Sequence, residues 1–223
     1  MAIRISIVIP ALNAARALPA ALAAVTNADE IVVVDGGSND DTVECARGSG
    51  ALVIRAPKGR GAQLSAGAAA ARYDWLLFLH ADTVLEPGWR KTCERFATST
   101  ADRAGSFRFA LDDSAWQARV LERLVSWRSH LLGLPYGDQG LFIHRTLFDA
   151  IGGYREMPLM EDVDIVRRLG RARLTIMPHQ AVTSAERWRR NGWLAQSLRN
   201  QVCLLLYLIG VSPARIRTIY ERR

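Results

Sequence analysis

Acidic side chains stand at two places in the chain where they could assist chemistry on a phosphate-bearing substrate. Asp82 directly follows the apolar run Leu76–Leu79, and Asp162 follows the segment PLM at the expected start of a helix. A carboxylate such as Asp82 suits Mg²⁺ or Mn²⁺, hard cations that leave positions open for substrate phosphates. Partial burial raises the pKa of a carboxyl group. Asp162 is therefore a candidate general base for a hydroxyl nucleophile.

The segment KGRGAQ supplies the opposite charge. Lys58 and Arg60 lie in flexible backbone just before an Ala-rich helical stretch, a combination that suits a phosphate. In DGGSNDDT, Asp35 is placed to accept a hydrogen bond from a nucleobase N–H. This segment is not GxGxxG, so it lacks the dinucleotide fingerprint.

Each of these features also has a plain structural interpretation. KGRG is equally typical of a solvated basic loop, and DGGSND of a strand-turn-helix corner. Acids at the start of a helix complement its dipole, as Glu161 and Asp162 would. His80 fits a hydrogen-bonded histidine at a strand end better than a ligand of a hard cation. Taken singly, the motifs leave these alternatives open.

The first 80 residues predict the elements that would position these side chains. Apolar β-branched runs at 3–9, 30–35, 51–55 and 74–80 alternate with helical segments at 15–25, 39–47 and after residue 58. This alternation indicates an α/β fold with a mostly parallel sheet and helices on both faces. Ligands bind outside the carboxyl ends of such strands, where Asn13, Asp35 and Asp82 are expected.

The second half is less regular. The segment 104–111 is predicted to be an exposed or edge strand, and 116–133 an amphipathic helix with Arg on its polar side. A short strand and helix follow GDQG, a helix follows PLM, and 173–178 is a strand. The tail from Asn191 to Tyr220 is helical and broken near Pro213.

Composition limits the class of protein. The 223 residues carry a net charge of +7, which favours anionic partners or reflects only a high Arg content. Cys45, Cys93 and Cys203 lie far apart, so they indicate neither a metal site nor a disulfide framework and fit a reducing cytoplasm. Pro10 comes too early for a signal-peptide core. No uninterrupted apolar run reaches the roughly 18 residues of a spanning helix.

The order of the motifs is more specific than any one of them. LNAARAL, VVVDGGSNDDT, KGRGAQLSAGA, FLHADT, GDQGLFIHR, GGY and PLMEDVDIVRRL follow one another along the chain. Over roughly residues 3 to 220 the chain resembles an inverting family 2 glycosyltransferase of the GT-A type. It looks most like the short bacterial subgroup often found beside radical-SAM and selenoprotein-associated genes.

The resemblance implies a role for each motif. A UDP- or GDP-sugar would contact the first half of the chain, at Pro10, Asn13, Asp35, Lys58, Arg60, Gln63, His80, Ala81 and Asp82. Asp82 would hold Mg²⁺ or Mn²⁺ where the family has its DxD motif. Asp138 and Gln139 would face the sugar or the acceptor. Glu161 and Asp162 match the ED pair, with Asp162 as the base.

The chain departs from the family pattern at three points. Ala14 replaces an acid that many relatives have, and His80 replaces the first acid of DxD. The processive QxxRW motif is broken, because Asn200 follows Gln196–Arg199 and the Arg187-Trp188 pair lacks the upstream Gln. A single-transfer enzyme is therefore expected. The alternatives are a nucleotidyltransferase and a non-catalytic sugar-nucleotide-binding or scaffold protein.

The expected organisation is a catalytic domain at 1–190, with a nucleotide-binding half at 1–83 and an acceptor half at 84–190, followed by a helical tail at 191–223. The tail is apolar nearly all round in its second half, and basic residues flank it. It either packs on the catalytic domain or a dimer partner, or touches anionic lipid from the cytoplasmic side. Lipid contact would suit a lipid-linked or amphiphilic acceptor. No nucleic-acid partner is expected.

Overall fold

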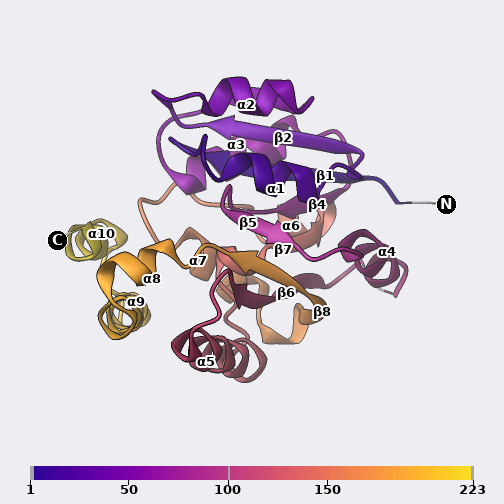
Figure 1. The fold of residues 1–223 in the computed structure, drawn as a ribbon. Helices are drawn as coiled ribbons and strands as arrows, with labels where there is room; N and C mark the ends of the chain where they lie inside the picture. Colours follow the sequence, from indigo (N-terminus) through magenta and orange to yellow (C-terminus); the bar gives the residue numbers. More distant parts are fainter. Residues whose placement is uncertain (1–2, 100, 222–223) are drawn as a thin grey trace.

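The computed structural model describes residues 3–99 and 101–221 and contains one eight-stranded sheet. The strands lie in the order β3-β2-β1-β4-β7-β6-β8-β5 (Figure 1). The first four are parallel to one another, β7 is antiparallel to β4 and β6, β8 is parallel to β6, and β5 is antiparallel to β8. The strands are β1 (Ile5–Ala11), β2 (Glu30–Asp35), β3 (Leu52–Arg55), β4 (Trp75–Phe78), β5 (Thr83–Leu85), β6 (Ala104–Leu111), β7 (Leu141–His144) and β8 (Leu174–Thr183).

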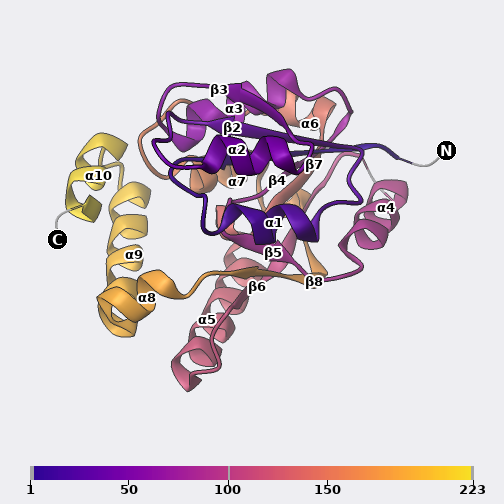
Figure 2. The same ribbon diagram turned by 45° about the horizontal axis from the view of Figure 1, so that its top comes forward.

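Helices cover both faces of this sheet (Figures 1 and 2). Helices α1 and α4 pack on one face, and α3, α6 and α7 on the other. The predicted α/β fold with a mostly parallel sheet is thus confirmed. The helices are α1 (Leu18–Ala24), α2 (Thr42–Gly48), α3 (Arg60–Ala70), α4 (Trp89–Ser99), α5 (Trp116–Leu132), α6 (Arg145–Ala150), α7 (Glu161–Leu169), α8 (Glu186–Asn191), α9 (Trp193–Leu208) and α10 (Pro213–Glu221), with short 3₁₀ turns η1 (Gly137–Gln139) and η2 (Arg171–Arg173).

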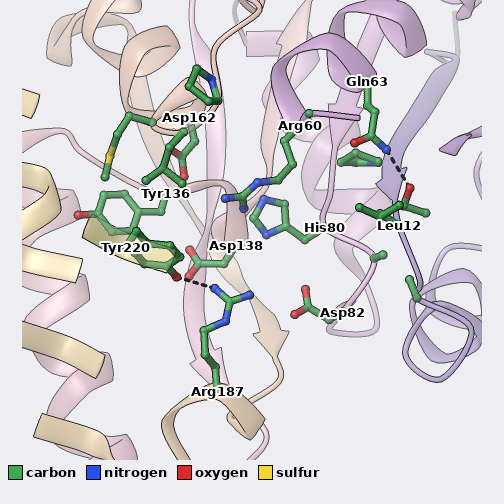
Figure 3. A pocket seen from close by; sticks show the side chains of 18 of the residues that line it. Leu12, Arg60, Gln63, His80, Asp82, Tyr136, Asp138, Asp162, Arg187 and Tyr220 are labelled. Atoms are coloured by element: carbon green, nitrogen blue, oxygen red, sulfur yellow. Dashed lines mark hydrogen bonds between the residues drawn. The ribbon is translucent and has the colours of Figure 1, made fainter. Parts of the chain in front are cut away.

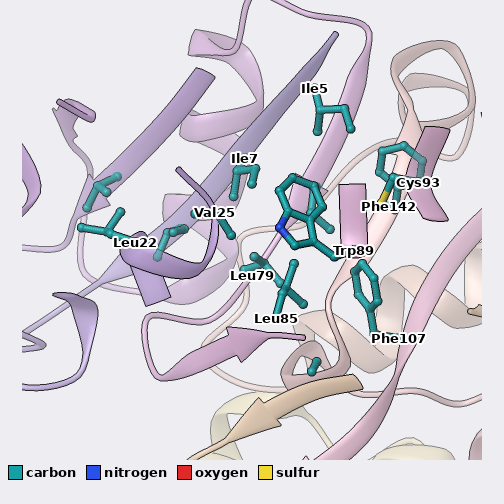
Figure 4. Packing of buried hydrophobic residues seen from close by; sticks show 14 of the residues in the cluster. Ile5, Ile7, Leu22, Val25, Leu79, Leu85, Trp89, Cys93, Phe107 and Phe142 are labelled. Atoms are coloured by element: carbon teal, nitrogen blue, oxygen red, sulfur yellow. The ribbon is translucent and has the colours of Figure 1, made fainter. Parts of the chain in front are cut away.

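Strand β1 explains why apolar runs without polar alternation form this sheet. Its alternate residues Ile5 and Ile7 pack with Leu22 and Trp89 (Figure 4). Val8 packs with Leu64 on the opposite face. All of these side chains are buried. Because successive side chains of a strand point to opposite faces, a strand covered on both sides must be apolar at every position.

Strand β1 also continues through Pro10, where the sequence predicts its end. Val8 pairs with Phe78, the last residue of β4, while Pro10 still pairs with Val34 of β2. The side of β1 that faced β4 is therefore open at Pro10, and the missing N–H of proline removes no ladder bond. The open side creates space at the carboxyl end of β1.

Two other expectations need correction. Strand β6 is not at an edge: it lies between β7 and β8, and only Arg108 of its eight residues is exposed. The prediction of an edge strand was wrong because both neighbours come from segments more than 30 residues later in the chain. Strand β5 and helices α4 and α8 were not anticipated.

Candidate functional site

A cavity of about 900 Å³ lies at the carboxyl ends of β1 and β4, between α3, the loop before α7, η1 and the C-terminal helices (Figure 3). Most of the predicted site residues line it, although they come from five separate segments. They are Pro10, Asn13, Lys58, Arg60, Gln63, His80, Ala81, Asp82, Asp138 and Asp162. Asp35, Gln139 and Glu161 do not line it.

The first loop of the site has an unusual backbone conformation at Asn13. Its φ is +50°, a left-handed value that asparagine tolerates better than most residues. The Asn13 N–H donates to Ser38 Oγ at 2.9 Å, and Asn13 Oδ1 accepts from the Asn39 N–H at 2.9 Å. The loops after β1 and β2 are therefore tied together at one rim of the cavity.

Asp35 is fully buried at the end of β2 and holds the turn that follows. Its carboxylate accepts hydrogen bonds from the N–H groups of Ser38 at 3.0 Å and Gly37 at 3.2 Å. Burial opposes ionisation, but these bonds and the Arg55 charge lower the pKa of Asp35 below its usual value. The contact with a nucleobase stays a prediction.

Gln63 ties the carboxyl ends of β1 and β2 together at the wall of the cavity. Its Nε2 donates to Ala11 O at 2.8 Å and to Val34 O at 2.7 Å, so one amide joins the ends of β1 and β2. The side chain is buried, and a Cβ on Gly36 would approach its Nε2 to 3.0 Å. The direct role of Gln63 is to hold the carboxyl ends of these strands together.

Replacing Gln63 by leucine is expected to destabilise the fold by about 1–3 kcal/mol, because Leu removes the donor that buried carbonyl groups share. The measurement is the free energy of unfolding by chemical denaturation. Ala69→Leu, at an exposed position of the same helix, is the control and should change stability by under about 0.5 kcal/mol. Equal stability of Gln63→Leu and the control would show that the clamp is energetically unimportant.

The acid pair at the start of α7 divides between two environments. Glu161 is buried, and its Oε1 lies 2.9 Å from Arg60 Nε of α3. Asp162 lines the cavity; its Oδ2 accepts from the Gly137 N–H at 2.9 Å and its Oδ1 from the Val163 N–H at 2.8 Å. The charge of Glu161 raises the pKa of Arg60, while burial raises the pKa of Glu161 above its usual value.

This pair therefore has one positioning member and one member open to a substrate. Glu161 orients Arg60, whose guanidinium faces the cavity beside His80 (Figure 3). Asp162 is held by two backbone N–H groups and retains lone pairs toward the cavity. The geometry is compatible with Asp162 as a general base, and that role stays a prediction.

His80 lies against η1, the short turn that carries Asp138, in a tightly packed part of the site. Burial and the Arg60 charge lower the pKa of His80 to about 3, so the imidazole is neutral. Burial raises the pKa of Asp138 to about 7 against the opposing charge of Arg128. A Cβ at Gly137 would lie 2.5 Å from His80 Nε2. Glycine at this position lets η1 approach the end of β4.

Gln139 is the third residue of η1 and points into the protein. Its Nε2 donates to Phe107 O at 2.9 Å, and its Oε1 accepts from Ser129 Oγ at 2.9 Å. These bonds anchor η1 to β6 and α5, which positions the neighbouring Asp138. The predicted contact of Gln139 with sugar or acceptor stays a prediction.

Asp82 fits a cation that brings most of its own ligands. Its carboxylate lines the cavity and makes no hydrogen bond or ion pair within residues 3–99 and 101–221. In that same part of the chain no group of three or more His, Cys, Asp or Glu residues could hold a metal ion. A single free carboxylate suits Mg²⁺ or Mn²⁺ that keeps waters and phosphate oxygens as its other ligands.

The C-terminal helices contribute cavity residues that the sequence did not reveal. Arg187 of α8 donates from Nη1 to the Tyr220 hydroxyl of α10 at 3.0 Å, and both line the cavity with Tyr136 (Figure 3). The only signal was the Arg187-Trp188 pair, noted as part of a broken motif. The predicted boundary at residue 190 between the catalytic domain and the helical tail stays a prediction. Arg222 and Arg223, two of the basic residues that flank the tail in the sequence, lie outside the described residues.

The tail also packs on the rest of the chain. Cys203 and Leu204 of α9 are buried, and Cys203 lies in a cluster with Leu159 and Ile216. Arg189 lies 3.2 Å from Asp112, so part of the basic flank is paired within the fold. No helix of the described residues is long and apolar enough to cross a bilayer. Lipid contact by the tail stays a prediction.

Comparisons with known proteins identify the family of the chain. The model of the family "Glycosyl transferase family 2" matches residues 6–157. An uncharacterised glycosyltransferase of Mycobacterium tuberculosis is 32% identical over 127 residues, covering 56% of this chain and 58% of that protein. An undecaprenyl-phosphate 4-deoxy-4-formamido-L-arabinose transferase of Pseudomonas savastanoi pv. phaseolicola is 28% identical over 170 residues, or 68% of this chain and 50% of that one. The chain thus spans only half to three-fifths of these relatives.

Solved structures share the fold. Glucosyl-3-phosphoglycerate synthase of Mycobacterium tuberculosis, crystallised with Mn²⁺, UDP and glucosyl-3-phosphoglycerate, has a TM-score of 0.57 at 21% identity, over 82% of this chain and 70% of that one. At this identity the likeness concerns the fold alone. The family match is the stronger finding, since it covers more than half of the 223 residues and includes the loops after β1, β3 and β4 that line the cavity. The chain belongs to glycosyl transferase family 2.

Proposed function

We propose that this chain transfers a sugar from a nucleoside-diphosphate sugar to an acceptor hydroxyl by a single displacement. The observation that carries the proposal is the cavity itself. It collects the carboxylates of Asp82, Asp138 and Asp162 and the cations of Lys58 and Arg60 at the carboxyl ends of parallel strands. The cations suit a diphosphate, and the carboxylates suit a hydroxyl nucleophile and a divalent ion.

In the proposed reaction Asp162 accepts the proton of the acceptor hydroxyl as its oxygen attacks the anomeric carbon. The bond from that carbon to the diphosphate oxygen breaks, and its electron pair leaves with the diphosphate. Arg60, held by Glu161, and Lys58 stabilise the negative charge that develops on the leaving group. One displacement inverts the anomeric configuration.

Asp82 is the residue that would hold a divalent ion, which when bound supplies Lewis-acid stabilisation of the departing diphosphate. Asp138 has a different role, because its raised pKa near 7 keeps a substantial fraction protonated at neutral pH. A protonated carboxyl group can donate a hydrogen bond to a sugar or acceptor oxygen. Arg187 and Tyr220, joined by a hydrogen bond, line the same cavity.

The proposal also covers which nucleotide sugar is the donor and which class of molecule is the acceptor. UDP-sugar is the preferred donor, supported by the structural neighbour crystallised with UDP-glucose and Mn²⁺, with GDP-sugar as the alternative. A lipid-linked or amphiphilic acceptor is supported by the relative named for transfer involving undecaprenyl phosphate. The assignment to the subgroup near radical-SAM and selenoprotein-associated genes rests on the motif order alone.

A thermal-shift screen tests the proposed function. Nucleoside diphosphates and nucleotide sugars are added with and without Mn²⁺, followed by turnover assays with acceptor mixtures. A ligand at about a hundred times its dissociation constant should stabilise the fold by about 2.7 kcal/mol. Failure of all nucleoside diphosphates and their sugars to shift the melting temperature would refute a nucleotide-sugar site.

Replacing Asp82 by alanine should remove the Mn²⁺-dependent part of nucleoside-diphosphate binding and leave the melting temperature of the free protein unchanged. The reason is that the Asp82 carboxylate makes no hydrogen bond or ion pair within the described fold. Isothermal titration calorimetry with and without Mn²⁺ measures the effect. Glu156→Ala is the matched control, an exposed acid that also lines the cavity. If nucleoside-diphosphate binding by Asp82→Ala still depends on Mn²⁺ as in the wild type, another residue holds the metal ion.

A further inference from the structure

Helix α5 carries a row of large apolar side chains on the face turned away from the sheet. The row consists of Trp116, Val120, Leu124, Trp127 and Leu131, spaced four, four, three and four residues apart. Because an α-helix has 3.6 residues per turn, these side chains form one stripe along its length. They are strongly exposed, with Trp116 at 71% and Trp127 at 61%. A contiguous apolar surface of this kind marks an interaction site.

The opposite face of α5 already satisfies the fold. Ala118 and Val125 are buried in a cluster with Phe109 and Leu111 of β6 and Trp188 of α8. Both ribbon views place α5 at the periphery of the molecule (Figures 1 and 2). The exposed stripe therefore contributes little to the stability of the free chain and is available to a partner.

A basic row runs beside the apolar stripe. Arg119, Arg123 and His130 occupy the adjacent helical positions, and with Arg108 of β6 and Trp127 they border a groove of about 670 Å³. Arg108 and Arg123 are exposed, and their side chains make no hydrogen bond or ion pair among the described residues. Glu122, the acid among the described lining residues, is 15% exposed and lies 2.8 Å from Arg119.

The charge of this face indicates the chemistry of its partner. A second copy of the same face would bring like charges together, whereas an anionic surface would neutralise Arg108 and Arg123. Helix α9 provides a comparison: Leu194, Leu198, Val202, Leu205 and Ile209 are exposed at the same spacing, but Ser197 and Gln201 stand where α5 has its basic row. Tryptophan and leucine beside arginine are typical of helices that lie in a membrane interface.

We propose that the exposed face of α5 binds the surface of an anionic lipid bilayer. The apolar stripe enters the boundary between headgroups and acyl chains, and Arg108 and Arg123 bind lipid phosphates in the groove. Tyr136, which lines the catalytic cavity, lies only four residues beyond the end of α5. Binding by α5 therefore brings the cavity close to the bilayer. The membrane contact does not depend on which reaction the cavity catalyses.

Vesicle flotation of the full chain tests this inference. The vesicles are phosphatidylcholine alone or phosphatidylcholine with phosphatidylglycerol, each at low and high salt. Three double variants are compared: Arg108→Ser with Arg123→Ser, Trp127→Ser with Leu131→Ser, and, as the matched control on α9, Leu198→Ser with Leu205→Ser. All six positions are exposed, and melting temperatures establish that each variant is folded.

The wild type should float with the anionic vesicles at low salt and much less at high salt. The partition coefficient of the arginine variant should fall about 30-fold, because each basic residue near an anionic surface usually contributes about 1 kcal/mol to the free energy of membrane binding. The Trp127 and Leu131 variant should also lose binding, and the α9 variant, which tests lipid contact by the tail, should lose less because α9 lacks the basic row beside its apolar residues. Wild-type protein that does not float with anionic vesicles at low salt overturns the proposal. Equal losses in the α5 variants and the α9 control would overturn it as well. The same holds if the wild type does not bind lipid but forms a concentration-dependent dimer that the Trp127 and Leu131 variant abolishes.

Discussion

Replacing Asp162 by asparagine is expected to reduce turnover by at least about 10²-fold while leaving donor binding nearly unchanged, the usual scale for loss of a positioned base. Asn keeps the size of the side chain but cannot accept the hydroxyl proton. Asp162 is the member of the acid pair that lines the cavity, and backbone N–H groups of Gly137 and Val163 orient its carboxylate. Steady-state kinetics measure the turnover, and calorimetry with a nucleoside diphosphate measures donor binding.

Two controls separate chemistry from folding. Because Asn offers one acceptor oxygen where Asp offers two, the melting temperature of Asp162→Asn must be compared with that of the wild type. Asp164→Asn is the matched variant on the same helix, because Asp164 is buried and pairs with Arg168 at 2.6 Å. This variant should be less stable than the wild type. Its turnover, corrected for the fraction of folded protein, should change little. Near-normal turnover by Asp162→Asn would show that Asp162 is not the general base and would leave Asp138 as the candidate.

Removing the Arg60 guanidinium should destabilise the fold by an amount that depends on pH. In Arg60→Met the buried carboxyl group of Glu161 loses the cation 2.9 Å away. An unpaired buried carboxylate takes up a proton, and the cost is about 1.4 kcal/mol for each pH unit above the ordinary pKa of glutamate. Because the pKa of Glu161 is already raised in the wild type, only the further rise counts, and we expect a destabilisation relative to the wild type of at most about 3 kcal/mol at pH 7 and under about 1 kcal/mol at pH 5.

The sign of this pH dependence follows from proton uptake. Burial already raises the pKa of Glu161 in the folded protein, and loss of Arg60 raises it further. The folded variant then binds more protons than the unfolded chain, so its stability decreases as pH rises. Denaturation at pH 5 and pH 7 measures the slope, and the double variant Arg60→Met with Glu161→Gln should remove the added pH dependence. A pH-independent loss in Arg60→Met would show that packing, rather than the ion pair, is responsible.

Local patterns were sufficient for the core of the fold. The apolar runs predicted β1 to β4 to within a few residues, and the helical period of 116–133 predicted α5 almost to its last residue. Strand β5 was not predicted because it has only three residues and is stabilised by pairing with β8, which begins some 90 residues later. The position of β6 failed for the same reason, since sheet order depends on long-range pairing that periodicity does not contain.

The candidate site shows a similar division. The order of the motifs identified which segments meet, because the carboxyl ends of parallel strands share one edge of a sheet. It did not distinguish side chains that face the cavity from those that support it. Gln63 and Gln139 were predicted as ligands, yet their amides bind backbone carbonyls and a serine hydroxyl inside the fold. Arg187 and Tyr220 were missed because they depend on how α8 and α10 fold back.

The position of α10 has a practical consequence for handling the protein. Tyr220 of α10 lines the cavity, so an affinity tag or reporter attached just after α10 would lie beside the cavity. The first described residues lead into β1 from the opposite end of that strand, away from the cavity (Figure 1). Tags, immobilisation chemistry and fluorescent fusions are therefore better placed before β1, where they leave both the cavity and α10 undisturbed.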